Sequence, residues 1–103
     1  MAFIPKWKDK NTDLLVKTLL SLKDAEDVNR LLDDLCTVSE IKAMAQRIYV
    51  AQLLADNTTY NTIAVKTGAS TATISRVKRC LNYGSGGYEK ALQSITEEVD
   101  DEK

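Results

Sequence analysis

The stretch from Tyr60 to Leu81, YNTIAVKTGASTATISRVKRCL, constrains the fold more than any other part of the chain. It predicts two short helices joined by a sharp turn at residues 67–69, because the glycine there can take a left-handed backbone conformation. Ser70 is expected to cap the second helix through its hydroxyl. An alanine before the turn and a branched residue after it let the helices cross closely at ~90–120°, as in the DNA-binding helix-turn-helix. We therefore predict such a motif over residues 58–82.

The second helix of this motif has two different faces. Ile74, Val77 and Leu81 lie at helical spacing and predict an inward apolar stripe. Short hydroxyl and methyl groups at a helix start can approach base edges, and cations further along can meet phosphates. The outward residues with this chemistry are Thr71, Ala72, Ser75, Arg76, Lys78 and Arg79. The alternative is an ordinary helical hairpin, since glycine between two short helices is common.

The distribution of charge favours DNA although the formal net charge is −1. Residues 37–90 carry a net charge of +4, whereas residues 91–103 carry −4. DNA responds to the local field, because charges beyond about 10 Å are largely screened at ordinary salt. The acidic tail at residues 100–103 is most simply a solvated end.

Length and composition predict a single all-α domain over residues 1–103. The chain is 44% apolar, with one proline and four glycines to interrupt helices. It has no stretch typical of a signal peptide or a membrane span. Cys36 and Cys80 are far apart and are interpreted as reduced core thiols, so we expect a cytoplasmic protein without membrane partners.

Four further helices complete a predicted set of six. Apolar periodicity and capping residues indicate three helices within residues 11–55, the first capped by Asn11 or Thr12. The third of these, residues 38–55, is apolar on most sides and should be buried on several of them. After a glycine-rich break, residues 88–99 form the last helix, with Leu92 and Ile95 as expected anchors.

These helices carry more apolar surface than one small chain can cover, so residues 11–55 are predicted to form a homodimer interface. Phe3, Ile4 and Trp7 could pack on the neighbouring chain. A two-fold dimer also suits DNA, because it presents two recognition helices to major grooves ~34–36 Å apart.

The segment 35–81, from LCTVSEIKAM to SRVKRCL, closely resembles the Trp repressor family, and in particular its Trp-repressor-related (YerC/YecD-like) proteins. The Trp repressor is itself a standard example of helix-turn-helix docking. The resemblance implies an intertwined all-α homodimer with a helix-turn-helix DNA-binding head. It also implies that Thr71, Ala72 and Ser75 lie against base edges, with Asn61 at the edge of the footprint.

The resemblance further implies a candidate ligand pocket formed by Thr37, Arg47 and Arg76. Two neighbours depart from the family pattern: Val77 replaces a glycine, and Cys80 replaces a hydroxyl that receives the ligand's amino group. Val77 fills space that tryptophan needs, and a thiol accepts hydrogen bonds poorly. We therefore expect a regulator that works without tryptophan. Two alternatives stay open: Arg47 is an arginine at the dimer surface with no ligand role, or the pocket binds another small effector.

The function that these features favour is a sequence-specific transcriptional regulator of double-stranded DNA, acting as a repressor. The alternative is a protein-interaction module whose helix-turn-helix does not read DNA. An enzyme is not expected, because the chain has no histidine, no Gly-rich phosphate loop and no glycine-flanked serine. No cofactor or metal is expected either.

Overall fold

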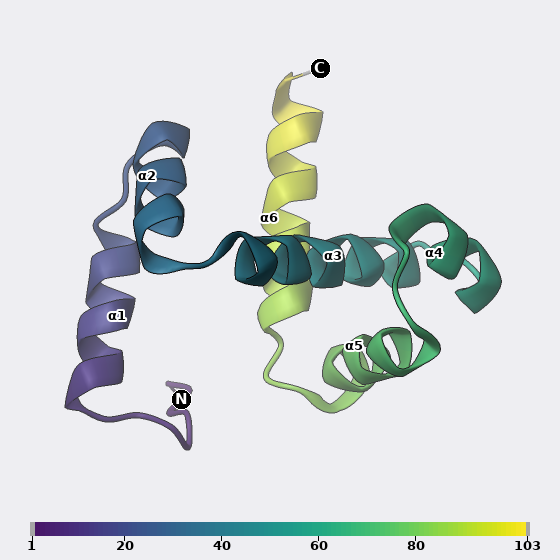
Figure 1. The fold of residues 1–103 in the computed structure, drawn as a ribbon, viewed down its shortest axis with the longest axis horizontal. Coiled ribbons are helices and arrows are strands. Elements are labelled where there is room, and N and C mark those ends of the chain that lie inside the picture. The colour runs from purple at the N-terminus through teal and green to yellow at the C-terminus, as the bar shows by residue number, and fades with distance from the viewer. Residues whose placement is uncertain (1, 103) are drawn as a thin grey trace. The chain divides into compact units, whose positions relative to one another are not determined.

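The computed structural model describes the backbone of residues 2–102 and the side chains of residues 2–96. It contains six helices in the described chain, as predicted (Figure 1). They are α1 Lys10–Leu20, α2 Ala25–Leu35, α3 Val38–Ala55, α4 Tyr60–Thr67, α5 Thr71–Tyr83 and α6 Gly87–Glu102. The last helix was predicted to end at residue 99, before an acidic tail at 100–103, and this was wrong, because α6 continues through Glu102. The side chains of this acidic stretch lie outside the described residues. Contacts divide the chain into two compact units, Met1–Val38 and Ser39–Lys103, and the single domain stays a prediction.

The start of α1 differs from the prediction, because the capping residue is Asp9 and not Asn11 or Thr12. The backbone N–H of Thr12 donates to the Asp9 carboxylate at 2.7 Å, and the Asp9 N–H donates to Thr12 Oγ1 at 2.8 Å. This reciprocal pair satisfies two backbone donors that a helix start would otherwise leave free. The hydrogen bond from Thr12 N–H also holds the pKa of the Asp9 carboxyl below its ordinary value.

The first unit has no hydrophobic core of its own. None of residues 2–38 is buried, and neither α1 nor α2 contains a buried residue. Most of its large apolar side chains are instead exposed, namely Phe3, Ile4, Trp7, Leu14, Leu15, Val16, Leu19, Leu20, Val28, Leu35 and Val38. Since apolar burial is the main favourable term in folding, this unit lacks the usual source of stability within one chain.

The second unit has a compact core built on the C-terminal half of α3. Its buried residues come from α3, α4, the turn after α4, and α5: Val50, Ala51, Leu53, Ile63, Ala69, Ile74 and Val77. Tyr88 and Leu92 bring α6 onto this core. Ile95 was predicted as a second anchor of α6, and this was wrong: it is 47% exposed, because the contact with the core is made one turn earlier.

Only part of α3 is covered by its own chain. Val50, Ala51 and Leu53 are buried, but Ile48 is 50% exposed and Tyr49 is also exposed. The prediction that α3 is buried on several sides therefore holds only for the last turns of the helix, around Val50, Ala51 and Leu53. Further towards its start, Ile41 and Met44 are only partly buried and Val38 is exposed.

The turn between α4 and α5 is closed by Gly68. Its φ of 73° lies in the left-handed region, and its N–H donates to the Ala64 carbonyl at 2.9 Å. Ala69, the next residue, is buried in the core. The chain thus makes a sharp turn at residues 67–69, as the sequence predicted.

Replacing Gly68 with alanine should lower the free energy of unfolding by about 1–2 kcal/mol, because a Cβ disfavours the left-handed conformation. Urea unfolding at a fixed protein concentration measures this. Gly87→Ala is the matched control, since Gly87 opens α6 and a Cβ there meets only open space. Equal losses in the two variants would contradict the role given to the Gly68 backbone.

Candidate nucleic-acid interface

The α4–α5 turn is held rigidly by side-chain hydrogen bonds as well as by glycine. Thr67 Oγ1 donates to the Ile63 carbonyl at 2.7 Å and accepts from the Ala69 N–H at 3.1 Å. Gln46 Nε2, on α3, donates to the Thr67 carbonyl at 3.1 Å. The end of α4 is therefore tied both to the turn and to α3, which fixes where α5 begins.

The start and the inner face of α5 are as predicted. The N–H of Thr73 donates to Ser70 Oγ at 3.1 Å, so Ser70 caps the helix. Ile74 and Val77 are each 1% exposed, and Leu81 is half-buried against the same core. Full burial of such a side chain stabilises a fold by about 1.5–3 kcal/mol, so this stripe sets the rotation of α5 about its axis.

With the inner face fixed, the predicted contact residues point outward. All seven are exposed: Asn61 on α4 and, on α5, Thr71, Ala72, Ser75, Arg76, Lys78 and Arg79. Helical periodicity puts Ala72, Arg76 and Arg79 nearest the centre of this face, with Ser75 beside them. Lys78 lies on its flank, with Nζ 5.5 Å from the centroid of the Tyr60 ring. We call the six α5 residues of this set, with Lys78 at their flank, the α5 outer face.

One exposed residue of this face was missed by the sequence analysis. Tyr83, in the last turn of α5, is 85% exposed and follows Arg76 and Arg79 at helical spacing. The signal was present in that spacing, but the glycine-rich run that follows led us to place residue 83 in the break.

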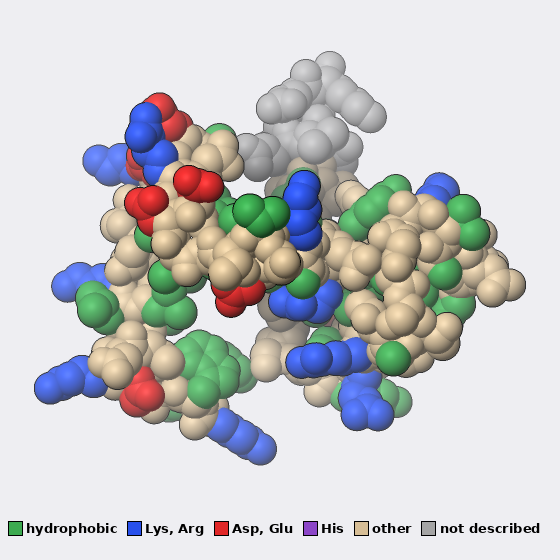
Figure 2. All heavy atoms as spheres, in the orientation of Figure 1, with side chains coloured by type: hydrophobic (Ala, Val, Ile, Leu, Met, Phe, Trp, Pro, Cys, Tyr) green, Lys and Arg blue, Asp and Glu red, His purple; other side chains and the backbone are tan. Residues whose placement is uncertain are grey.

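The stretch of chain that carries the α5 outer face has only positive charges. Residues 57–88 contain no Asp or Glu, and their charges are Lys66, Arg76, Lys78 and Arg79. Figure 2 shows Lys and Arg side chains over α5 without an acidic side chain among them. Such a face can attract a polyanion although the whole chain is slightly acidic.

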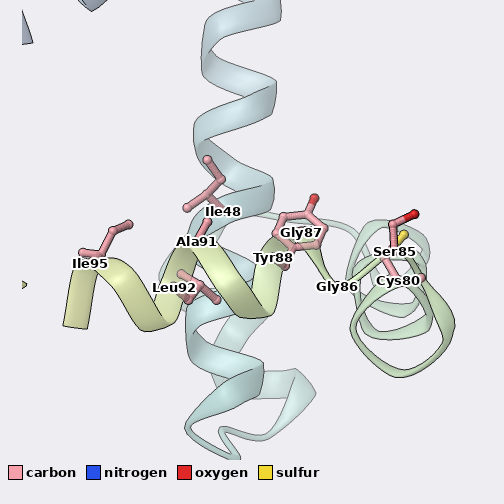
Figure 3. A pocket seen from close by; sticks show the side chains of 10 residues that line it. Ile48, Cys80, Ser85, Gly86, Gly87, Tyr88, Ala91, Leu92 and Ile95 are labelled. Atoms are coloured by element: carbon pink, nitrogen blue, oxygen red, sulfur yellow. The ribbon is translucent and has the colours of Figure 1, made fainter. Parts of the chain in front are cut away.

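Behind the outer face, an apolar groove of about 460 Å³ lies between α3, the end of α5 and α6 (Figure 3). Its walls include Ile48 of α3, Cys80 of α5, and Ala91 and Ile95 of α6. Both cysteines are free thiols, as expected. However, Cys80 is exposed and Cys36 only half-buried, so the prediction of core thiols was wrong: Cys80 lines the open groove and is not packed in the core.

The candidate ligand residues are spread over different elements. Arg47 is half-buried on α3, and Arg76 is exposed on α5. Thr37 is exposed and belongs to the first unit. None of the three lines the apolar groove. The ligand pocket therefore stays a prediction.

Comparison with known proteins decides the family. The sequence model described as Trp repressor protein matches residues 10–96, which is most of the chain. The chain belongs to the Trp repressor family. Among curated proteins, this family member is 54% identical over 94 residues to YerC of Bacillus subtilis (strain 168), whose function is uncharacterised. That alignment covers 91% of this chain and 90% of YerC.

Solved structures of two similar proteins have the same fold. A TrpR-like protein from Eubacterium eligens ATCC 27750 has a TM-score of 0.85 at 45% identity, covering 88% of this chain and 94% of that chain. A candidate Trp repressor from Staphylococcus aureus has a TM-score of 0.84 at 42% identity, covering 88% and 91%. The Trp-repressor-like six-helix fold is thus confirmed. In the part of the chain that the structure describes, no helix combines the length and apolar character needed to span a membrane.

Replacing Thr67 with valine should lower the free energy of unfolding by about 1–3 kcal/mol, because the N–H of buried Ala69 loses its acceptor. Thermal or urea unfolding measures this. Thr96→Val is the matched control: Thr96 Oγ1 also donates to the carbonyl four residues earlier, at 2.9 Å, but lies on an exposed stretch of α6. A loss in Thr96→Val as large as in Thr67→Val would rule out a special role for the turn.

Proposed function

We propose that this Trp repressor family member is a sequence-specific DNA-binding transcriptional regulator that acts as a homodimeric repressor and not as an enzyme. The observation that carries the proposal is the α5 outer face. It combines short polar and apolar side chains with cations, all exposed, on a helix whose opposite face is locked into the core. This is the arrangement that a recognition helix needs in order to enter a major groove.

The chemistry of the face suggests a division of roles. Thr71, Ala72 and Ser75, in the first half of α5, are short enough to let the backbone approach base edges. Arg76, Lys78 and Arg79 follow them and supply phosphate contacts. Asn61, exposed on α4, would lie at the edge of the footprint.

Homodimerisation is supported by the apolar surface that one chain leaves uncovered. The first unit buries no residue, and the second unit has an open apolar groove beside the exposed side chain of Ile48. We propose that a second copy covers these surfaces in an intertwined dimer, with residues 11–55 as the main interface. Two α5 outer faces would then meet successive major grooves of cytoplasmic DNA.

Tryptophan is not the proposed effector. Val77 takes part in the buried core of the second unit and leaves no free space at its position. Cys80 offers a thiol, which would pair poorly with a ligand ammonium. A different small molecule that uses Thr37, Arg47 and Arg76 remains an open proposal.

The wild-type protein should bind selected genomic fragments with an affinity that falls steeply with salt, by a slope of about 0.9 per phosphate contacted. Ser75→Phe should abolish the preference among fragments, because the bulky ring holds α5 away from base edges. Gel shifts over a salt series measure both quantities.

The control for that variant is Ser85→Phe, the same substitution at an exposed position in the loop after α5. It should keep the fragment preference. If Ser75→Phe also kept it, α5 would not be the reading helix. If the wild-type protein bound no DNA at low salt, a protein-interaction module would become the better reading.

The midpoint of thermal unfolding should rise with protein concentration, because association stabilises only the folded chains. Sedimentation should give twice the chain mass of 11.4 kDa. Leu15→Asp, which places a charge among the exposed apolar residues of α1, should weaken association. Lys17→Asp on the same helix is the control, and an unfolding midpoint independent of concentration would contradict the dimer.

A further inference from the structure

We infer that Tyr60 is a positioning residue for DNA binding: its ring holds the Lys78 ammonium against the start of α4, where this cation meets a backbone phosphate. The inference deepens the proposed function and rests on it. Its starting point is the distance of 5.5 Å between Lys78 Nζ and the centroid of the Tyr60 ring. That distance lies within the ~6 Å over which a ring face attracts a cation.

The two partners differ in a way that suits this role. Tyr60 is half-buried and packs against the core of the second unit, so its ring is fixed. Lys78 is exposed, so its ammonium stays accessible to a ligand. The ring therefore acts as a support for the lysine and leaves it free to bind.

The position of Lys78 separates it from the two arginines of α5. Arg76 and Arg79 project from the central part of the α5 outer face, whereas Lys78 turns towards the first residue of α4. Tyr60 and Lys78 line the same surface depression of about 370 Å³, together with Thr58, Thr59 and Asn82. When a recognition helix enters the major groove, the preceding helix crosses the DNA backbone. The flank between α4 and α5 is thus expected to face phosphates and not bases.

Lys78 forms no ion pair among the described residues, so its charge is available to a ligand. The carboxylates nearest to it in the sequence are Asp56 and Glu89, outside the stretch 57–88 that carries α4 and α5. A free lysine side chain has many rotamers, and fixing them opposes binding. A cation already held over a ring loses less of this freedom when it meets a phosphate, which is the benefit of preorganisation.

The test is a double-mutant cycle measured by DNA binding over a salt series, with the selected fragments and a random-sequence duplex as probes. Lys78→Gln should lower the salt slope by about two, because each of two subunits loses a phosphate contact worth about 0.9. Tyr60→Leu should weaken binding to both probes about fivefold, and Tyr60→Phe should stay close to wild type, since phenylalanine keeps the ring. In the Lys78→Gln background, Tyr60→Leu should have no further effect.

Lys90→Gln gives the matched control, because Lys90 is an exposed cation on α6 outside the interface. The effect of Tyr60→Leu should be undiminished in that background. Additive losses of affinity in the Tyr60/Lys78 cycle would overturn the inference. A loss of affinity in Tyr60→Phe equal to that in Tyr60→Leu would overturn it as well, because the hydroxyl and not the ring would then be the contact. Absence of DNA binding by the wild-type protein would overturn the proposed function and this inference together.

A readout without DNA separates the contact from a general loss of structure. The ε-methylene protons of Lys78 should show an upfield ring-current shift relative to those of Lys90, present in Tyr60→Phe and lost in Tyr60→Leu. If wild-type Lys78 showed no such shift, the ring would not hold the ammonium in solution. If Tyr60→Leu failed to fold, the ring-current shift of wild-type Lys78 would still test the contact, and the salt slope of Lys78→Gln would still test the phosphate.

Discussion

The whole arrangement depends on the packing of α5 onto α3 and α4. Ile74 and Val77 fill the space beside Val50 and Ile63, and these four are the largest fully buried side chains of the described residues. Because interiors are close-packed, α5 has one favourable rotation about its axis. That rotation decides which side chains reach solvent. The chemistry of the outer face is therefore specified by residues that never touch a ligand.

Hydrogen bonds at the turn convert this packing into a rigid unit. Gly68 makes the turn, and Thr67 Oγ1 accepts a hydrogen bond from the N–H of Ala69, which is buried in the core. Gln46 links the same corner to α3. The α5 outer face is therefore held with little conformational freedom. This favours selective binding, because less conformational entropy is lost when a ligand binds.

The sequence predicted this unit well because its determinants are local. Glycine at the turn, serine at the cap and the spacing of Ile74, Val77 and Leu81 each act within a few residues, and the structure agrees with all of them. Two of the errors concern cover supplied from further away. Ile95 and Cys80 are apolar or weakly polar and read as core residues, yet both line an open groove. Periodicity says which face of a helix is apolar but not whether anything lies on it. The Lys78–Tyr60 contact was also beyond prediction, since it joins two helices across eighteen residues.

The uncovered first unit has a consequence for how such a protein would respond to its own abundance. A lone subunit exposes ten large apolar side chains of residues 3–35 to water. Local unfolding of α1 and α2 therefore breaks few buried apolar contacts. Segments of this kind are cut readily by proteases, and the proposed dimer would shield them. Pair formation scales with the square of the subunit concentration, so at low concentration most chains would be single and would be degraded. Dimers would accumulate only once synthesis outpaces this degradation. Occupancy of DNA would then rise as a threshold and not in proportion to expression.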